Sequence, residues 1–185
     1  IAEAEGGVAR IVRGFDELGN QTSEEHFDEK GNPVLEKGGF ASMKQSFDES
    51  GARLTTDYFG ADGTRKKQGD RAGERLTRDA MGYILTAEII GENGEPASPI
   101  AKFTYTYDAR GNRVRSEGVD KEGKPAANAE KVARYDWKYD DRGHEIEELH
   151  YDVNGKLVLA GGSAGHLSKF DVWGREIERT YLGED

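Results

Sequence analysis

The sequence predicts an all-β protein: an array of six stacked β-hairpin repeats of about 31 residues that forms an open or solenoid-like antiparallel sheet. Glycines recur in pairs 12 residues apart, as from Gly19 to Gly31, five times along the 185 residues. An aspartate stands three residues before the first glycine of each repeat, and an alanine stands seven residues before that aspartate. The stretches around these glycines alternate apolar and polar residues with a period of two, which is typical of strands.

The first glycine of each repeat ends an Asp-x-x-Gly motif, as in YTYDARGN at residues 105–112. Asp at the first position and Gly at the fourth fit a type I turn, in which the carboxylate accepts hydrogen bonds from nearby backbone N–H groups. The glycine then takes the left-handed conformation and completes a three-residue hairpin loop with a bulge. We predict structural turns at Asp16 and Gly19, Asp48 and Gly51, Asp108 and Gly111, Asp140 and Gly143, and Asp171 and Gly174.

Strands are expected on both sides of each turn. In VARYDWKYD, residues 132–140, the alanine and three aromatic residues share one face and charged residues share the other. The returning segment HEIEELHYD, residues 144–152, is long enough for a second strand. A shorter third strand is expected after the second glycine, as in GNPVL at 31–35 and GKLVLA at 155–160. No helix is predicted.

We treat residues 1–185 as a single array, because the same pattern covers almost all of it. Aromatic residues recur before the turn aspartate and again four residues before the second glycine, and we expect each repeat to bury this pair against the next repeat. The predicted repeats are residues 7–38, 39–70, 71–99, 100–130, 131–161 and 162–185. The rings concerned are Phe15, Phe47, Tyr107, Tyr139 and Phe170 in the first slot, and Phe27, Phe59 and Tyr151 in the second.

The third repeat departs from the pattern. Arg78 and Ile90 replace aromatic residues, and Pro96 and Pro99 lie in the shortest connection. We interpret these changes as drift that strong neighbouring repeats tolerate. The alternative is a bend or a docking place.

Composition excludes several classes of function. The net charge of −10, from 36 acidic and 26 basic residues, opposes binding to nucleic-acid phosphates and to anionic membranes. There is no cysteine, so thiolate nucleophiles, disulfides and cysteine-ligated zinc are excluded. No apolar run approaches the roughly 20 residues of a membrane-spanning helix. The chain begins with Ile1 instead of Met, and we expect it to be part of a larger polypeptide.

The fourth and fifth repeats, YTYDARGNRVRSEGVDKEGKP and WKYDDRGHEIEELHYDVNGKL, resemble the YD repeats of bacterial RHS proteins. The shared features are the Tyr-Asp-x-x-Gly core, the alternating tyrosines before it and the polar strand after it. The Asn-Gly-Lys turns give a weaker likeness to MORN-type hairpin repeats. The period of about 31 residues is longer than the usual YD unit. The resemblance implies a bacterial cell-envelope or secreted scaffold without catalytic residues in its repeats.

No catalytic motif accompanies the repeats: nucleophile elbows, phosphate loops and dinucleotide fingerprints are missing. We therefore predict a non-enzymatic protein without a cofactor. Of the four histidines, His144 and His150 lie about 20 Å apart on one strand and cannot share a metal. Glu148 and His150 supply two ligands, and a third is not visible.

One acidic set recurs six residues after the first glycine: Glu25, Asp57, Glu88 and Glu117. Repeats stacked in register would align these carboxylates as a ladder of like charges, which requires compensation. We expect pairing with bases on adjoining strands, namely Arg10, Lys44, Arg75 and Lys102. The alternative is a calcium-binding module that uses the four acidic positions.

Four aromatic residues lie outside the repeated slots: Trp173, Tyr58, Tyr83 and Tyr181. Exposed aromatic residues are typical contacts for carbohydrate or protein ligands, whereas local packing is the alternative. We therefore predict a non-catalytic repeat scaffold that mediates spacing, or binding to a protein or glycan through these four residues.

Overall fold

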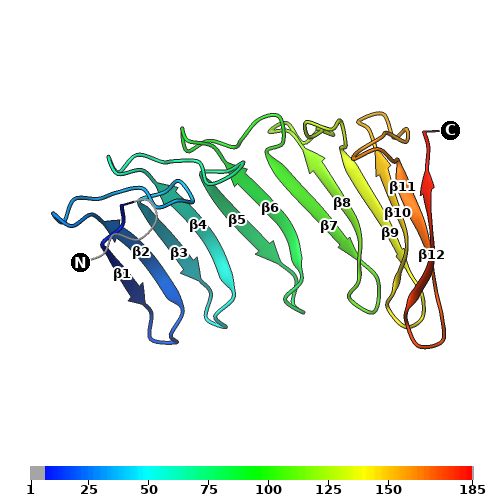
Figure 1. Cartoon of the computed structure of the whole chain (residues 1–185), viewed down its shortest axis with the longest axis horizontal. Coiled ribbons are helices and arrows are strands. Elements are labelled where there is room, and N and C mark those ends of the chain that lie inside the picture. Colours follow the sequence, from blue (N-terminus) through cyan, green and yellow to red (C-terminus); the bar gives the residue numbers. More distant parts are fainter. Residues whose placement is uncertain (1–6, 185) are drawn as a thin grey trace. The chain divides into compact units, whose positions relative to one another are not determined.

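The computed structural model describes residues 7–184, and the regular structure of this part of the chain consists of β-strands alone (Figure 1). The chain divides into two compact units, Ile1–Ala97 and Ser98–Asp185. Inside each unit every strand pairs antiparallel with its neighbours in sequence, in the orders β1-β2-β3-β4-β5-β6 and β7-β8-β9-β10-β11-β12. The predicted all-β fold of stacked hairpins is confirmed.

Each unit contains three hairpins. The strands of the first are β1 (Arg10–Phe15), β2 (Gln21–Phe27), β3 (Ser42–Phe47), β4 (Arg53–Phe59), β5 (Gly73–Arg78) and β6 (Ile84–Ile90). Those of the second are β7 (Lys102–Tyr107), β8 (Arg113–Val119), β9 (Arg134–Tyr139), β10 (Glu145–Tyr151), β11 (Gly165–Phe170) and β12 (Glu176–Leu182). In Figure 1 the tight hairpin turns of a unit lie at one end of its strands and the longer connections lie at the other. The part of the chain that the structure describes has no helix long and apolar enough to cross a membrane.

The prediction of a third strand in each repeat is wrong. After the second glycine the chain makes one isolated antiparallel bridge, as between Tyr151 and Leu157, and then turns away. Proline occupies the bridging position in three repeats, at Pro33, Pro96 and Pro125. A proline cannot donate a ladder hydrogen bond, so it suits a strand that stops after one bridge. Pro96, which we took for a departure of the third repeat, therefore lies in the common pattern.

The repeated alanine occupies the most buried position of the repeat. The N–H of Ala133 donates to the Tyr151 carbonyl in its own hairpin (2.8 Å), and its carbonyl accepts from Gly118 N–H of the preceding repeat (2.8 Å). Its backbone thus joins three strands, and only a small side chain is present where they converge. The corresponding alanines, Ala41, Ala72, Ala101, Ala133 and Ala164, are all at most 5% exposed.

The expected burial of aromatic pairs between repeats is only partly right. Phe15 is 60% exposed, whereas the aliphatic occupants of the second slot, Ile90 and Val119, are buried. The rings of that slot pair with cations across the hairpin: the guanidinium of Arg134 lies 4.0 Å from the Tyr151 ring centre. The cation covers one face of the ring, where we expected a second ring. A cation–π contact of this kind contributes about 0.5–1 kcal/mol at an exposed site.

Arg78, which we interpreted as drift, makes a specific contact with the preceding repeat. Its guanidinium donates to the carbonyl of Arg53 in the preceding repeat. In the fifth repeat Tyr139 fills the same slot, and its hydroxyl donates to the carbonyl of Arg113 (3.1 Å), which is the equivalent residue of the fourth repeat. Arg78 therefore replaces the tyrosine hydroxyl as the donor that links neighbouring repeats.

Candidate functional site

In the hairpin turns the aspartate carboxylates accept hydrogen bonds from backbone N–H groups. In the first turn the Asp16 carboxylate accepts from Leu18 N–H (3.0 Å) and Asn20 N–H (2.8 Å), while Gly19 N–H donates to the Asp16 carbonyl (3.1 Å). Gly19 has a φ of 85°, where only glycine is unstrained. The same bonds recur around Asp48, Asp108, Asp140 and Asp171. These aspartates serve as structural corners of the chain.

Hydrogen bonds to the charged form lower the pKa of the turn carboxyls. A side-chain hydrogen bond from Asn20 is the largest cause at Asp16. At Asp140 the bond from His144 Nδ1 (2.9 Å) is the largest cause, and with the backbone donors it lowers the pKa to about 2. The carboxylates are therefore charged over the ordinary pH range and remain acceptors.

The turn tips also link consecutive repeats in the second unit. Arg110 at one tip donates to the carbonyl of Asp140 (3.3 Å) and to the carboxylate of Asp141 (3.0 Å) in the next turn. Arg142 at that next turn donates in the same way to the carbonyl of Val172 (2.6 Å) in the last turn. Each arginine thus satisfies a turn carbonyl of its neighbour.

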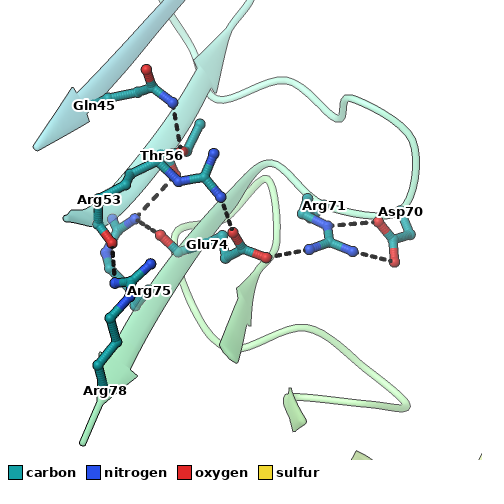
Figure 2. A network of polar contacts seen from close by, with 8 residues as sticks. All are labelled: Gln45, Arg53, Thr56, Asp70, Arg71, Glu74, Arg75 and Arg78. Carbon is teal, nitrogen blue, oxygen red and sulfur yellow. Dashed lines mark hydrogen bonds and ion pairs between the residues drawn. The ribbon is translucent and has the colours of Figure 1, made fainter. Parts of the chain in front are cut away.

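A polar network fills the junction between the second and third repeats (Figure 2). Glu74 on β5 is mostly buried and accepts from Arg53 on β4 (2.9 Å) and from Arg71 in the preceding loop. Arg71 also donates to Asp70 (2.8 Å). Within the same picture Gln45 donates to Thr56 (3.2 Å). A buried carboxylate between two guanidiniums is compensated, so this network fixes the junction.

The predicted acidic positions do not converge on one point. Asp57 is bound by Arg65 and by Arg75 (2.9 Å), and it lies opposite Lys44 in the strand pairing. Glu88 lies opposite Arg75, and Glu117 lies opposite Arg134 on the next strand. Glu25 lies opposite Val12 and Ser42. Two guanidiniums therefore compensate Asp57, and Glu88 and Glu117 each have an arginine opposite them in the strand pairing. Among the described residues no group of three His, Asp or Glu side chains is placed to hold a metal ion.

Two histidines form a repeated motif that we did not predict. His150 is 6% exposed; its Nε2 lies 2.9 Å from a Glu148 oxygen and its Nδ1 lies 3.3 Å from the Ser163 carbonyl in the next repeat. His26 is equally buried and has the same arrangement with Glu24 (2.9 Å) and the Phe40 carbonyl (3.4 Å). In each motif one ring nitrogen faces a carboxylate oxygen of its own strand and the other faces a backbone carbonyl of the next repeat.

Glu148 is the centre of a polar cluster in the second unit. Burial raises the pKa of its carboxyl, but hydrogen bonds from His150 and from Trp137 Nε1–H (2.7 Å) outweigh burial and lower that pKa overall. Burial and the nearby Glu148 charge raise the pKa of Glu145. His166, at 9% exposure, lies between them, 3.4 Å from Glu145 and 3.9 Å from Glu148. The cluster joins the fifth and sixth repeats.

The four predicted binding residues differ in exposure. Trp173 is 77% exposed at the last turn, with the Arg175 guanidinium 5.0 Å from its ring centre, and Tyr181 is 69% exposed on β12. Tyr58 is half-buried, and its ring lies 5.2 Å from the Phe40 ring. Tyr83 is also half-buried and follows a turn glycine. Trp173 and Tyr181 are thus the two accessible rings of the four.

Tyr58 and Tyr181 also belong to a repeat position that sequence reasoning missed. They lie seven residues after the first glycine, the position that His26 and His150 fill in other repeats, and which Ile89 and Gly118 fill in the third and fourth. In the first, second, fourth and fifth repeats this residue donates its N–H to the carbonyl of the next repeat's alanine, as His150 does to Ala164 (2.9 Å). A count from the turn glycine would have revealed the position, although its chemistry varies from repeat to repeat.

No protein-family model matches the sequence, and no curated protein matches it. Solved structures do match the fold. A crystal structure of TcdB2-TccC3 without its hypervariable C-terminal region gives a TM-score of 0.60 at 16% identity, covering 90% of this chain and 7% of that chain. A crystal structure of TcdB2-TccC3-Cdc42 gives a TM-score of 0.54 at 14% identity, covering 94% of this chain and 10% of that one. The likeness is one of fold. The chain spans a tenth or less of the length of these structures.

Proposed function

We propose that the chain is a non-catalytic repeat scaffold, related to the YD repeats of bacterial RHS proteins and carried by a secreted or cell-surface polypeptide. The proposal is supported by one observation: many of the polar groups of the chain are hydrogen-bonded to other parts of the same chain. Turn aspartates accept backbone N–H groups, tip arginines satisfy carbonyls of the next turn, and Glu74 and Glu148 bind donors from neighbouring strands. Groups engaged in this way build a rigid support.

The fold of much longer solved chains supports the same proposal. A segment that corresponds to a tenth or less of such a chain fits a structural element that is repeated many times. Its function would then be spacing, together with the presentation of accessible side chains. Trp173 and Tyr181 are suited to a protein or glycan ligand, because a ring stacks on the apolar face of a sugar or inserts into an apolar pocket.

Binding is tested with the intact chain on a glycan array and in pull-down experiments from bacterial surface extracts. We expect a retained glycan or protein whose binding is lost in Trp173→Ala. Phe15→Ala is the matched control, because it removes another exposed ring (60%) at the first turn of the chain. Equal loss in both variants, or no retained partner for the wild type, contradicts ligand binding and reduces the proposal to spacing.

A further inference from the structure

Two of the four junctions that join neighbouring hairpins inside the units contain a buried histidine. His26 lies where β2 meets β3, at 2% exposure, and His150 lies where β10 meets β11, at 6% exposure. The equivalent residue is Tyr58 where β4 meets β5 and Gly118 where β8 meets β9. All four residues donate their N–H to an alanine carbonyl of the next repeat. The four junctions thus share one backbone bond, and two of them have a side chain at this position that changes its charge near neutral pH.

The ring of His26 lies between a carboxylate of its own repeat and a backbone carbonyl of the next. Its Nε2 is 2.9 Å from a Glu24 oxygen, and its Nδ1 is 3.4 Å from the carbonyl oxygen of Phe40, whose ring also packs against it. Arg13 on β1 donates to the other Glu24 oxygen (2.6 Å), and Met43 on β3 lies opposite Glu24. Burial raises the pKa of the Glu24 carboxyl, but hydrogen bonds from His26 and Arg13 outweigh burial and lower it overall. Glu24 is therefore a charged acceptor near neutral pH.

His150 makes the same two contacts, with a Glu148 oxygen (2.9 Å) and with the Ser163 carbonyl oxygen (3.3 Å). The ionisable groups around it come from three strands: Tyr135 on β9, Glu145 and Glu148 on β10, and His166 on β11. His166 is thus a second histidine at this junction. His26, by contrast, is the only histidine among residues 1–97 of the sequence, so the junction of β2 with β3 shows the effect of one ring alone.

A histidine ring with an acceptor beside each nitrogen satisfies both acceptors only when it is protonated. A neutral imidazole has one N–H donor and one lone pair, whereas an imidazolium donates from both nitrogens. The contact with the carboxylate is the shorter of the two and is charge-assisted, so a neutral ring should keep its proton on Nε2. The Nδ1 lone pair then faces the carbonyl oxygen of the next repeat, and the side-chain hydrogen bond across the junction is lost.

We propose that His26 and His150 are proton-dependent links between neighbouring repeats: protonation adds a hydrogen bond from Nδ1 to a carbonyl of the next repeat and tightens the junction. The closed junction then holds one proton more than the open one, so its stability falls as the pH rises through the range in which histidine changes its charge, about pH 5 to 8. The junctions that contain Tyr58 and Gly118 lack this response. The inference goes beyond the proposed scaffold function and does not depend on a bound ligand.

Native-state hydrogen exchange of the intact chain at about pH 5.5 and about pH 8 tests the links, with each rate divided by the intrinsic rate at that pH. The amides to compare are the four that bond to an alanine carbonyl across a junction: His26, Tyr58, Gly118 and His150. We expect the protection of the two histidine amides to fall about tenfold from the lower pH to the higher, the size expected for one hydrogen bond from a charged donor. The other two should stay within about twofold, because their junctions have no such donor. Equal changes at all four amides, or no change at the histidine amides, overturn the inference.

Two further measurements identify the ring responsible. Nitrogen NMR chemical shifts of the His26 ring report its charge, and both nitrogens should carry a proton at the pH where the His26 amide is most protected. His26→Tyr places the side chain of the second repeat at this junction, and it should abolish the pH response of the amide at position 26 while leaving that of His150. His144→Gln removes a histidine bonded to Asp140 inside its own turn, and as the matched control it should leave both responses unchanged. A response that persists in His26→Tyr, or a ring that stays neutral while protection changes, overturns the inference and leaves the proposed function to its own binding test.

Discussion

Gly165 provides the sharpest test of how closely neighbouring repeats approach. It is the first residue of β11, its φ is 146°, and it lies opposite Leu149 of β10. A Cβ built at this position would come 2.0 Å from the carbonyl oxygen of Glu148 and 2.9 Å from the Cα of Leu149. Both contacts are with backbone, so a side-chain rotation cannot relieve them. Gly165→Ala must separate β10 from β11 or distort them.

The cost has two parts. A non-glycine residue held at this φ costs about 1–3 kcal/mol. An extra carbon forced into a packed junction costs about 1–3 kcal/mol. We expect Gly165→Ala to lower the free energy of unfolding by about 2–6 kcal/mol, and the amides of β11 and β12 to lose hydrogen-exchange protection before those of β7 and β8.

Urea unfolding and native-state hydrogen exchange check this expectation. The matched control is Gly183→Ala, because Gly183 has no atom within 4 Å of an added Cβ and no positive φ, and its unfolding free energy should change by at most about 0.5 kcal/mol. If Gly165→Ala changes the free energy of unfolding as little as the control does, β10 and β11 do not approach as closely as the structure indicates. Uniform loss of protection across β7 to β12 would contradict the local character of the junction.

Two further predictions concern single side chains. Arg78→Tyr should retain wild-type stability, because Tyr139 makes the equivalent bond, whereas Arg78→Ala should lose about 0.5–1.5 kcal/mol in urea unfolding; equal losses in both variants would show that the bond to Arg53 is unimportant. The lowered pKa of Asp140 means that its stabilising contribution is complete above the ordinary value of 3.8 and is lost as the pH falls through about 2. Urea midpoints measured down to this pH should therefore fall more steeply for the wild type than for Asp140→Asn, and parallel curves would contradict the prediction.

The hairpin turns and the strand order could be predicted because they depend on local chemistry. An aspartate that accepts two N–H groups and a glycine at positive φ determine a turn within five residues, so Asp16 and Gly19 are recognisable without tertiary information. The constant distance between the paired glycines then orders the hairpins along the chain. The long segments on either side of each turn could only be strands of similar length.

Ring burial and the repeat junctions could not be predicted, because they depend on neighbours from other repeats. Phe15 and Tyr151 belong to the repeated ring slots, yet one is exposed and the other is covered by Arg134. His150 is buried only because the carbonyl of Ser163 and the carboxylate of Glu148 surround it. Conversely, Arg78 departs from the aromatic pattern but keeps the donor function of Tyr139. The repeat conserves contacts while its residue types vary.

The central claim is that inside each unit every hairpin is hydrogen-bonded in register to the next, and trans-hydrogen-bond scalar couplings measured by NMR test it most directly. The account predicts a coupling between the Gly118 amide nitrogen and the Ala133 carbonyl carbon, and another between His150 and Ala164, where the donor–acceptor distances are 2.8 Å and 2.9 Å. These should accompany the coupling from Ala133 to Tyr151 inside one hairpin (2.8 Å). A spectrum that contains only the coupling inside the hairpin would contradict the stacking of repeats.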